Sequence, residues 1–354
     1  MTAPDPRLAL LAQWLQNDLG RRIARIEVAS ADASFRRYFR AFDDAGRSLV
    51  VMDAPPDKED VRPYLRVAGL LESTGVHVPH VHATDLARGF VLLEDLGSTP
   101  YLSQLGDPER VEPLYGDALA ALSRIQADGR EAARELAPYD AAVLEREMAL
   151  MPEWFCERHL RLGLDDSDRE VLRATFDTLV GEALAQPVVF VHRDFHSRNL
   201  MVIPQGNPGI IDFQDALAGP VGYDLVSLLK DCYVGWPRER VEGWVGAYRN
   251  RLRAAGFAAG AGSGEAEFLR WFDMIGVQRH VKVLGIFARL WYRDGKPGYL
   301  ADLPLTLHYV RDTCGRHPQL AAFGRWLERR VVPVFERVNP QVIAAARAAP
   351  GAGA

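Results

Sequence analysis

The sequence has few of the features that mark secreted, membrane or metal-cluster proteins. Its only cysteines are Cys156, Cys232 and Cys314, which are too far apart in sequence to form a metal-ligand pair. It contains no run of 18 uncharged apolar residues, and its N-terminus has no basic stretch before an apolar core. We therefore expect neither a membrane span nor a secretory signal, and we expect reduced thiols in a cytoplasmic protein.

A large excess of charge of either sign is also absent. The chain has 42 Lys and Arg against 47 Asp and Glu, a formal net charge of -5 at pH 7. This balance argues against nucleic acid as the main partner. The composition, 48% hydrophobic and 25% charged over 354 residues, is that of a globular protein with two domains or one two-lobed domain.

What the sequence does contain is one stretch with the chemistry of phosphoryl transfer. From His192 to Asn199 it reads H-R-D-F-H-S-R-N, and residues 210–213 then read I-I-D-F. Kinases use the pattern H-R-D-x-x-x-x-N followed by D-F. Phosphoryl transfer needs a carboxylate that orients the attacking hydroxyl and accepts its proton, and hard oxygen ligands for Mg²⁺. Asp194 is therefore the predicted catalytic base, and Asn199 and Asp212 are the predicted metal ligands.

Two residues are predicted to support this loop. His192 is expected to bond to the backbone and to a downstream aspartate, and Asp224, which opens a helix, is the expected partner. His192, Asp194 and His196 also permit a metal-hydrolase interpretation, but no further group of ligand spacing supports it. The interval from Asp212 to Asp224 is too short for the activation segment of a protein kinase, which favours a small-molecule substrate.

The order of the predicted elements indicates two lobes and an α+β fold. Helical spacing is expected at 5–19 and 60–74, and strands are expected at 25–28, 35–42, 48–52, 76–81 and 89–94. From about residue 100 the pattern is mainly helical. The predicted boundaries are 1–96 for a small nucleotide-binding β-sheet lobe, 97–343 for a helical lobe with the catalytic loop, and 344–354 for a disordered tail.

These motifs and three longer stretches resemble the aminoglycoside phosphotransferase-like family of the protein-kinase fold. The stretches are VHRDFHSRNLM at 191–201, IIDFQDALAGPVGYDLVSLLKDCYVGWPRER at 210–240 and QRHVKVLGIFARLWYRDGKPGYLADLP at 278–304, and the resemblance covers roughly 5–340. It implies a two-lobed kinase fold, ATP as co-substrate and Mg²⁺ as cofactor. The longer stretches are most similar to members that phosphorylate the anomeric (C1) hydroxyl of N-acetylmuramate and N-acetylglucosamine in peptidoglycan recycling. An amino sugar is therefore the implied small-molecule partner.

The predicted nucleotide-binding residues are Ser34, Phe35, Arg36, Glu94 and Leu96. The chain has no G-x-G-x-x-G loop, and small residues before Phe35 take its place, where backbone N–H groups can approach phosphates. Met52 occupies the position of the usual phosphate-binding lysine, so we expect another cation, Arg36, Arg37 or Lys58, to hold the phosphates. Arg36 and Arg37 alternate along a strand, and only one of them is predicted to face the phosphates. The hinge near Glu94 is expected to offer backbone groups to adenine.

The predicted substrate-binding residues are Asp231, Tyr233, Gln278, Arg279, His280 and Lys282. The basic character of the stretch 276–293 suits an anionic or neutral sugar, such as N-acetylmuramate with its lactyl carboxylate. Tyr233 is a candidate for stacking on the sugar ring, and Asp231 is a candidate acceptor for its hydroxyls. Core packing of the aromatic residue and a solvated basic face remain open alternatives.

Two other functions also remain open. One is a different small-molecule kinase of the family, acting on choline, an amino acid hydroxyl or an aminoglycoside. A cationic substrate would need an acidic cleft or an aromatic cage, which the sequence does not show. The other is a pseudokinase that binds nucleotide as a scaffold. Met52 favours it a little, whereas the intact Asp194, Asn199 and Asp212 argue against it.

Overall fold

The computed structural model describes residues 5–31, 35–257 and 264–339. The chain divides into two compact units, one of Met1–Pro100 with Leu200–Asp215 and one of Tyr101–Asn199 with Ala216–Ala354. The short segment 200–215, which the sequence-based boundaries left in the helical lobe, thus groups with the first unit. The expected tail at 344–354 lies outside the described residues. Within the described ranges no helix combines the length and apolarity needed to cross a bilayer.

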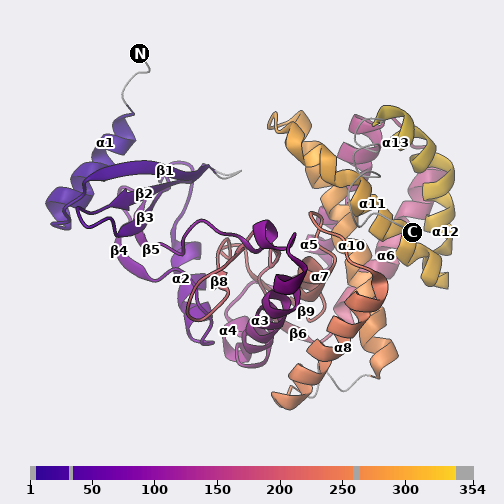
Figure 1. Ribbon diagram of the computed structural model, residues 1–354. Coiled ribbons are helices and arrows are strands. Elements are labelled where there is room, and N and C mark those ends of the chain that lie inside the picture. Colours follow the sequence, from indigo (N-terminus) through magenta and orange to yellow (C-terminus); the bar gives the residue numbers. More distant parts are fainter. Residues whose placement is uncertain (1–4, 32–34, 258–263, 340–354) are drawn as a thin grey trace. The chain divides into compact units, whose positions relative to one another are not determined.

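The first unit is built on a five-stranded antiparallel sheet with the strand order β1-β2-β3-β5-β4 (Figure 1). Its strands are β1 (Arg25–Ala31), β2 (Arg37–Phe42), β3 (Ser48–Asp53), β4 (Val81–Asp85) and β5 (Phe90–Glu94), and α2 (Arg62–Glu72) lies between β3 and β4 in the chain. The predicted order of strands and helix is confirmed. The fourth strand begins only at Val81, later than expected, because Pro79 cannot donate a ladder hydrogen bond.

Helix α1 (Pro6–Gln13) packs its apolar stripe on this sheet. Asp5 caps the helix, since its side chain accepts hydrogen bonds from the N–H groups of Arg7 and Leu8. Leu11 and Trp14 are buried in one cluster with residues of the central strands. The helix continues as a π-helical turn, η1 (Trp14–Asp18), so the expected helix over 5–19 is confirmed. Burial of this stripe is what holds a helix of eight residues in place.

The segment 200–215 adds a two-stranded hairpin to the first unit. Its strands are β7 (Leu200–Met201) and β8 (Gly209–Ile210). Val202 donates its N–H to the carbonyl oxygen of Thr99 at 2.8 Å, and Ile210 donates to the carbonyl of His77 at 2.8 Å. These main-chain bonds join the hairpin that precedes Asp212 to the N-terminal part of the unit.

The second unit is mainly helical. Its helices are α3 (Pro108–Ala127), α4 (Arg130–Arg134), α5 (Ala141–Met148), α6 (Asp166–Leu184), α7 (Tyr223–Leu229), α8 (Arg238–Ala254), α10 (Glu265–Tyr292), α11 (Leu303–Arg316), α12 (Ala321–Trp326) and α13 (Val332–Val338). Shorter helical turns are η2 (Tyr101–Gln104), η3 (Met151–His159), η4 (Pro297–Asp302), η5 (Pro318–Leu320) and η6 (Leu327–Val331). Strands β6 (Val188–Val191) and β9 (Leu217–Pro220) form an antiparallel pair. The molecule therefore has an α+β fold.

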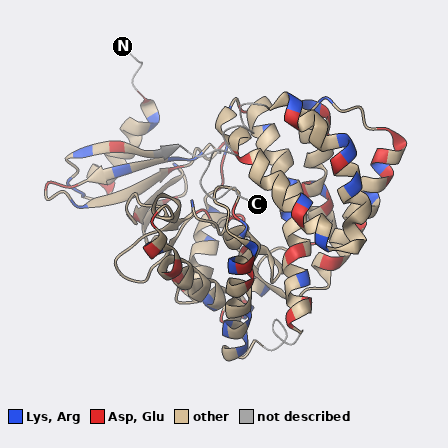
Figure 2. Cartoon of the chain, turned by 45° about the vertical axis from the view of Figure 1, so that its right-hand side comes forward, with Lys and Arg blue, Asp and Glu red and all other residues tan. Residues whose placement is uncertain are grey.

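Helix α10 is the central helix of the second unit. Most of its 28 residues are buried, and its contacts include η3, α11, α6 and α7. A Cβ at Gly285 would lie 2.3 Å from the carbonyl carbon of Leu150, so only glycine allows this close crossing. Figure 2 shows acidic and basic residues interspersed along the helices of this unit. Several charged residues of α10 are nevertheless buried, among them Asp273, Arg279 and Lys282, and they contribute to the site described below.

Candidate active site

The catalytic loop follows β6 and is held by Asp224. The Asp224 carboxylate accepts the main-chain N–H of His192 at 2.7 Å and that of Arg193 at 2.9 Å. Arg193 has a φ of 77°, a left-handed conformation that a non-glycine residue keeps only when its neighbours hold it. The sequence paired His192 with Asp224, and the structure brings them together through the main chain. The His192 ring instead accepts the N–H of Asp194 through Nδ1 at 3.3 Å.

Asp224 is fully buried, and its ionisation reflects this position. Burial raises its pKa to about 7, which the hydrogen bonds from the N–H groups of His192 and Arg193 oppose. The negative charge of Asp194 adds to the upward shift. The loop is thus tied to a carboxyl group that changes its charge near neutral pH.

Asp194 itself stays ionised. Burial opposes its charge, but the surrounding cations, Lys282 and Arg279 among them, outweigh burial and hold the pKa of Asp194 below its usual range. A carboxylate in this state accepts hydrogen bonds at neutral pH and is suited to orient a substrate hydroxyl. This is the chemistry predicted for Asp194 from the sequence.

Asp231 braces the other end of the loop. It is fully buried, and it accepts the main-chain N–H of Ser197 at 3.0 Å and also the Ser197 hydroxyl. Its second oxygen accepts the N–H of Tyr233 at 3.1 Å. Both carboxylate oxygens of Asp231 therefore accept hydrogen bonds from the chain itself. In this state Asp231 fixes the end of the catalytic loop.

The two predicted magnesium ligands belong to different units. In the second unit, Asn199 donates its amide Nδ2 to the carbonyl oxygen of Asp194 at 3.0 Å, which fixes its side chain on the catalytic loop. In the first unit, Asp212 has a φ of 64° and a side chain that is 37% exposed. Gln214 donates to its Oδ1 at 2.9 Å. A carboxamide and a carboxylate are the oxygen donors that Mg²⁺ prefers, so these side chains fit the metal that kinases of this fold use with ATP.

In the first unit the two candidate phosphate-binding arginines have different surroundings. Nη2 of Arg36 lies 4.0 Å from Oδ1 of Asp212, and its side chain is 11% exposed. Arg37 instead forms ion pairs with Asp5 and with the buried Asp53. The two arginines therefore have different partners: Arg36 lies near Asp212, whereas Arg37 belongs to a structural ion-pair group.

Phe35, Glu94 and Leu96 are the other predicted nucleotide-binding residues that the structure describes. Ser34 is outside the described residues. Phe35 is 64% exposed, and its N–H donates to Glu59 at 3.2 Å. The Glu94 carboxylate is paired with the His77 ring at 3.0 Å, so its side chain already has a partner within the first unit. Leu96 packs with Met201, Ile203 and Ile211 in a small apolar cluster, whereas Met52 is fully buried in β3.

A buried ion cluster on α5 and α10 contacts the catalytic loop, and sequence reasoning missed its centre. Glu147 forms ion pairs with Lys282, at 2.9 Å, and with the guanidinium of Arg193. It also accepts hydrogen bonds from the Tyr139 hydroxyl and, at 3.4 Å, from Gln278 Nε2. Lys282 donates to the Tyr223 hydroxyl at 3.0 Å. Glu147 lies 46 residues before Arg193 and belongs to no motif, so no sequence signal marked it.

Arg279 has fewer partners than its neighbours on α10. Its side chain is 4% exposed, and within the described part of the chain its only hydrogen bond is to Cys232 Sγ, at 3.6 Å. A thiol is a weak acceptor for a guanidinium. The negative charges of Asp194 and Asp231 act on Arg279, which places it in the electrostatic field of the catalytic loop. Arg279 is thus a buried cation with unused donor capacity toward an anion or a sugar oxygen.

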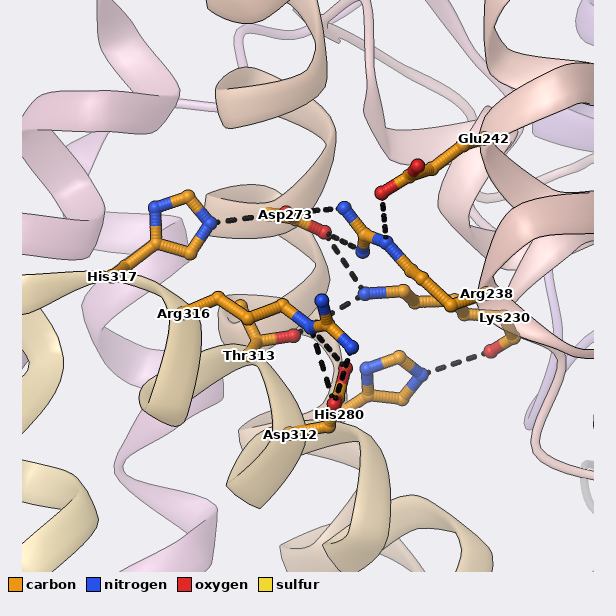
Figure 3. Close-up of polar contacts among 9 residues, drawn as sticks. All are labelled: Lys230, Arg238, Glu242, Asp273, His280, Asp312, Thr313, Arg316 and His317. Atoms are coloured by element: carbon orange, nitrogen blue, oxygen red, sulfur yellow. Dashed lines mark hydrogen bonds and ion pairs between the residues drawn. The ribbon is translucent and has the colours of Figure 1, made fainter. Parts of the chain in front are cut away.

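His280 belongs to a structural network. Its Nε2 bonds to the carbonyl oxygen of Lys230 at 2.9 Å, and burial together with the nearby Arg279 charge lowers its pKa to about 3. Figure 3 shows Lys230, Arg238 and His317 converging on Asp273. Because Lys230 directly precedes Asp231, this network anchors the residue that braces the loop.

Comparison with known proteins agrees with this arrangement. The family model described as phosphotransferase enzyme family matches residues 25–269, so the chain belongs to that family. The N-acetylmuramate/N-acetylglucosamine kinase of Pseudomonas putida is 47% identical over 335 residues, covering 92% of this chain and 96% of that protein. The protein of the same name from Neisseria meningitidis is 45% identical over 315 residues, covering 88% and 92%.

Solved structures support the fold. The choline kinase LicA of Streptococcus pneumoniae aligns with a TM-score of 0.60 at 12% identity, covering 86% of this chain and 99% of that one. The aminoglycoside phosphotransferase APH(2'')-Ib aligns with a TM-score of 0.55 at 15% identity, covering 86% and 98%. At such identities the likeness shows the two-lobed kinase fold alone.

Proposed function

We propose that this protein is a kinase that transfers the γ-phosphoryl group of ATP to the anomeric (C1) hydroxyl of N-acetylmuramate and N-acetylglucosamine in peptidoglycan recycling. The observation that carries this proposal is the 45–48% identity, over most of the chain, to three kinases named for these two sugars. We place the reaction in the cytoplasm, consistent with three buried and unpaired cysteines.

The acceptor side of the reaction rests on Asp194. The sugar hydroxyl donates its hydrogen bond to the ionised Asp194, the new bond forms between the C1 oxygen and the γ-phosphorus, and the bond from that phosphorus to the β-phosphate oxygen breaks. The hydroxyl proton passes to the Asp194 carboxylate, and ADP leaves. Because an anomeric hydroxyl is more acidic than an ordinary alcohol, a base with a lowered pKa suffices here.

The donor side rests on residues of the first unit. Arg36 is the proposed phosphate-binding cation, since Arg37 is committed to Asp5 and Asp53. Asn199 and Asp212 would hold Mg²⁺, which when bound neutralises charge that develops on the phosphates. Phe35, Glu94 and Leu96 stay assigned to the nucleotide, with Glu94 acting through its backbone because its carboxylate is paired with His77.

The substrate side favours an anionic or neutral sugar over a cation. Arg279 is the proposed partner of the lactyl carboxylate of N-acetylmuramate, because it is buried with only a thiol as a hydrogen-bond partner in the described part of the chain. Gln278 and Lys282 are proposed to act beside it, through the cluster around Glu147. Tyr233 is proposed to pack against the ring.

The experiment is a substrate panel with Mg-ATP. ADP release and the anomeric proton signal are followed for N-acetylmuramate, N-acetylglucosamine, choline and an aminoglycoside. We expect turnover of both amino sugars with loss of the free anomeric hydroxyl. We expect no turnover of choline or of the aminoglycoside. Turnover of choline or of the aminoglycoside, without turnover of the amino sugars, would overturn the proposal. Binding of ATP without turnover of any acceptor in the panel would indicate a pseudokinase.

A further inference from the structure

Asp302 is a half-buried carboxylate that no role described so far uses. It lies at the end of η4 and at the N-cap position of α11, where an aspartate ordinarily accepts an N–H from the first helical turn. It does not do so here: no capping hydrogen bond is present, and its ψ of -6° is helical rather than extended. Pro304, at the second helical position, also lacks an N–H to donate.

The carboxylate therefore keeps its acceptor capacity. Within the described ranges no hydrogen bond or ion pair involves its oxygens, and a half-buried acceptor without a partner is costly. Burial raises the pKa of Asp302 to about 6, the charge of Arg198 opposes this shift, and the charge of Asp231 adds to it. At neutral pH the group is ionised and can accept hydrogen bonds. Of the two residues whose charges shift the pKa of Asp302, Arg198 belongs to the catalytic loop and Asp231 braces it.

Tyr299, three residues before Asp302 on the same helical turn η4, belongs to an aromatic cluster. The Arg198 guanidinium is centred 3.5 Å from the Tyr233 ring and 6.0 Å from the Tyr299 ring. Phe287 joins the two tyrosines, with ring centroids 6.3 Å from Tyr233 and 5.3 Å from Tyr299. Tyr233 also meets the His196 ring edge-on at 5.5 Å, so the cluster is continuous with the loop that carries Asp194.

This combination is the chemistry of a sugar subsite. The faces of a pyranose ring present C–H groups that pack on aromatic rings, and its rim presents hydroxyls that donate to carboxylates. We propose that Asp302 determines acceptor specificity by accepting a hydrogen bond from a sugar ring hydroxyl, while Tyr299 packs against the sugar. The proposal rests on the proposed function, whose phosphorylated hydroxyl is a different one.

The chemistry of the two substrates narrows the hydroxyl. N-acetylmuramate carries its lactyl ether on O3, so the hydroxyls it shares with N-acetylglucosamine, apart from the one at C1, are those at C4 and C6. If Asp302 serves both sugars, its partner is one of these two. The 4-deoxy and 6-deoxy analogues of N-acetylglucosamine therefore identify the contact.

The test compares Asp302→Asn with the wild type on N-acetylglucosamine and on both deoxy analogues. We expect the mutation to raise the sugar KM by roughly 10- to 100-fold, with the KM for ATP and the melting temperature unchanged, because a hydrogen bond to a charged acceptor is lost. On one deoxy analogue the mutant and the wild type should differ by less than about twofold, since that partner is already missing. Tyr299→Leu should also raise the sugar KM, and Asp177→Asn, at an exposed site on α6, is the matched control.

The outcomes separate the two proposals. If the wild type phosphorylates the amino sugars but Asp302→Asn leaves their KM unchanged, the assignment of Asp302 is wrong and the proposed function stands. An equal loss on all three sugars would also overturn the assignment, because no hydroxyl would then account for it. If the wild type phosphorylates neither amino sugar, both proposals fail.

Discussion

Arg36 and Asp212 face each other in the first unit, with 4.0 Å between Nη2 and Oδ1. A cation next to a predicted metal ligand is suited to match the negative charge of phosphates. Arg37, one residue later, is turned to Asp5 and Asp53 instead. Arg36 directly precedes β2 and Arg37 is its first residue, so these adjacent arginines have different partners at the start of one strand.

We expect Arg36→Ala to raise the KM for ATP by about 10- to 100-fold, through loss of a charge-assisted phosphate contact. Arg37→Ala is the matched control and should change that KM less than about twofold, while lowering stability because Asp53 loses a partner. Steady-state kinetics with varied ATP and a melting curve measure both effects. Equal KM values for the two variants would contradict this account, as would a large gain from Met52→Lys, since the buried Met52 site is not built for a cation.

Asp194→Asn should reduce turnover by roughly 10²–10⁴-fold while the fold and ATP affinity persist, because the group that accepts the hydroxyl proton is removed. The acidity of the anomeric hydroxyl favours the lower end of this range. Turnover under saturating sugar and ATP is the measurement, with ATP titration as the control for binding. Undiminished turnover would remove Asp194 from the mechanism.

Asp212→Ala should abolish activity and weaken the binding of Mg-ATP more than that of ATP without metal. The physical reason is the loss of a carboxylate ligand for a divalent cation. Calorimetric titrations with ATP in the presence and absence of Mg²⁺ give the two affinities. A uniform weakening in both titrations would mean that Asp212 does not act through the metal.

Glu147→Gln should lower the free energy of unfolding by about 3–5 kcal/mol, since the buried charges of Arg193 and Lys282 lose their counterion. Glu157→Gln, which breaks an exposed pair with Arg169, should cost no more than about 1 kcal/mol. Denaturant unfolding measures both. Similar losses in the two variants would show that the cluster around Glu147 is not specially important to the fold.

Because the pKa of Asp224 is raised in the fold, we expect the free energy of unfolding to depend on pH. Its pKa in the fold is raised to about 7 from an ordinary value of 3.8, so the folded chain retains a proton that the unfolded chain releases. The contribution of Asp224 to stability is therefore full below about pH 4 and declines as the pH rises to about 7. Unfolding free energies at pH 5, 6, 7 and 8 should show this decline, and Asp224→Asn should flatten it. An unchanged slope in the variant would assign the titration to another group.

Sequence reasoning recovered the parts of this molecule that depend on local pattern. The strands of the first unit follow from apolar and alternating runs, and the roles of Asp194, Asn199 and Asp212, which stay predictions, rest on a motif with a fixed spacing. The pairing of β6 with β9 was not predicted, because long-range strand partners leave no local periodicity. Glu147 and Asp302 were missed for the same reason, since each acquires its surroundings only when distant helices pack together.

The sequence was also a weaker guide to what each charged residue does. Asp231 was predicted to bind substrate from its place just after the motif, and His280 from the polar and basic character of the stretch 276–293. The structure gives Asp231 three internal donors and gives His280 a carbonyl partner. Residue type limits the chemistry of a side chain, but only packing determines whether that chemistry is already used within the fold.

The grouping of Leu200–Asp215 with the first unit has a consequence for how such proteins can be recombined. The chain passes between the units three times, after Pro100, after Asn199 and after Asp215. A gene fragment ending at Pro100 would encode the sheet without the hairpin that its main chain is bonded to. Exchange of the first unit between relatives therefore requires two coordinated grafts, one of the N-terminal hundred residues and one of the sixteen residues that interrupt the second unit. A single crossover would leave Asp212 and Arg36, which lie 4.0 Å apart in one unit, on segments from different parents.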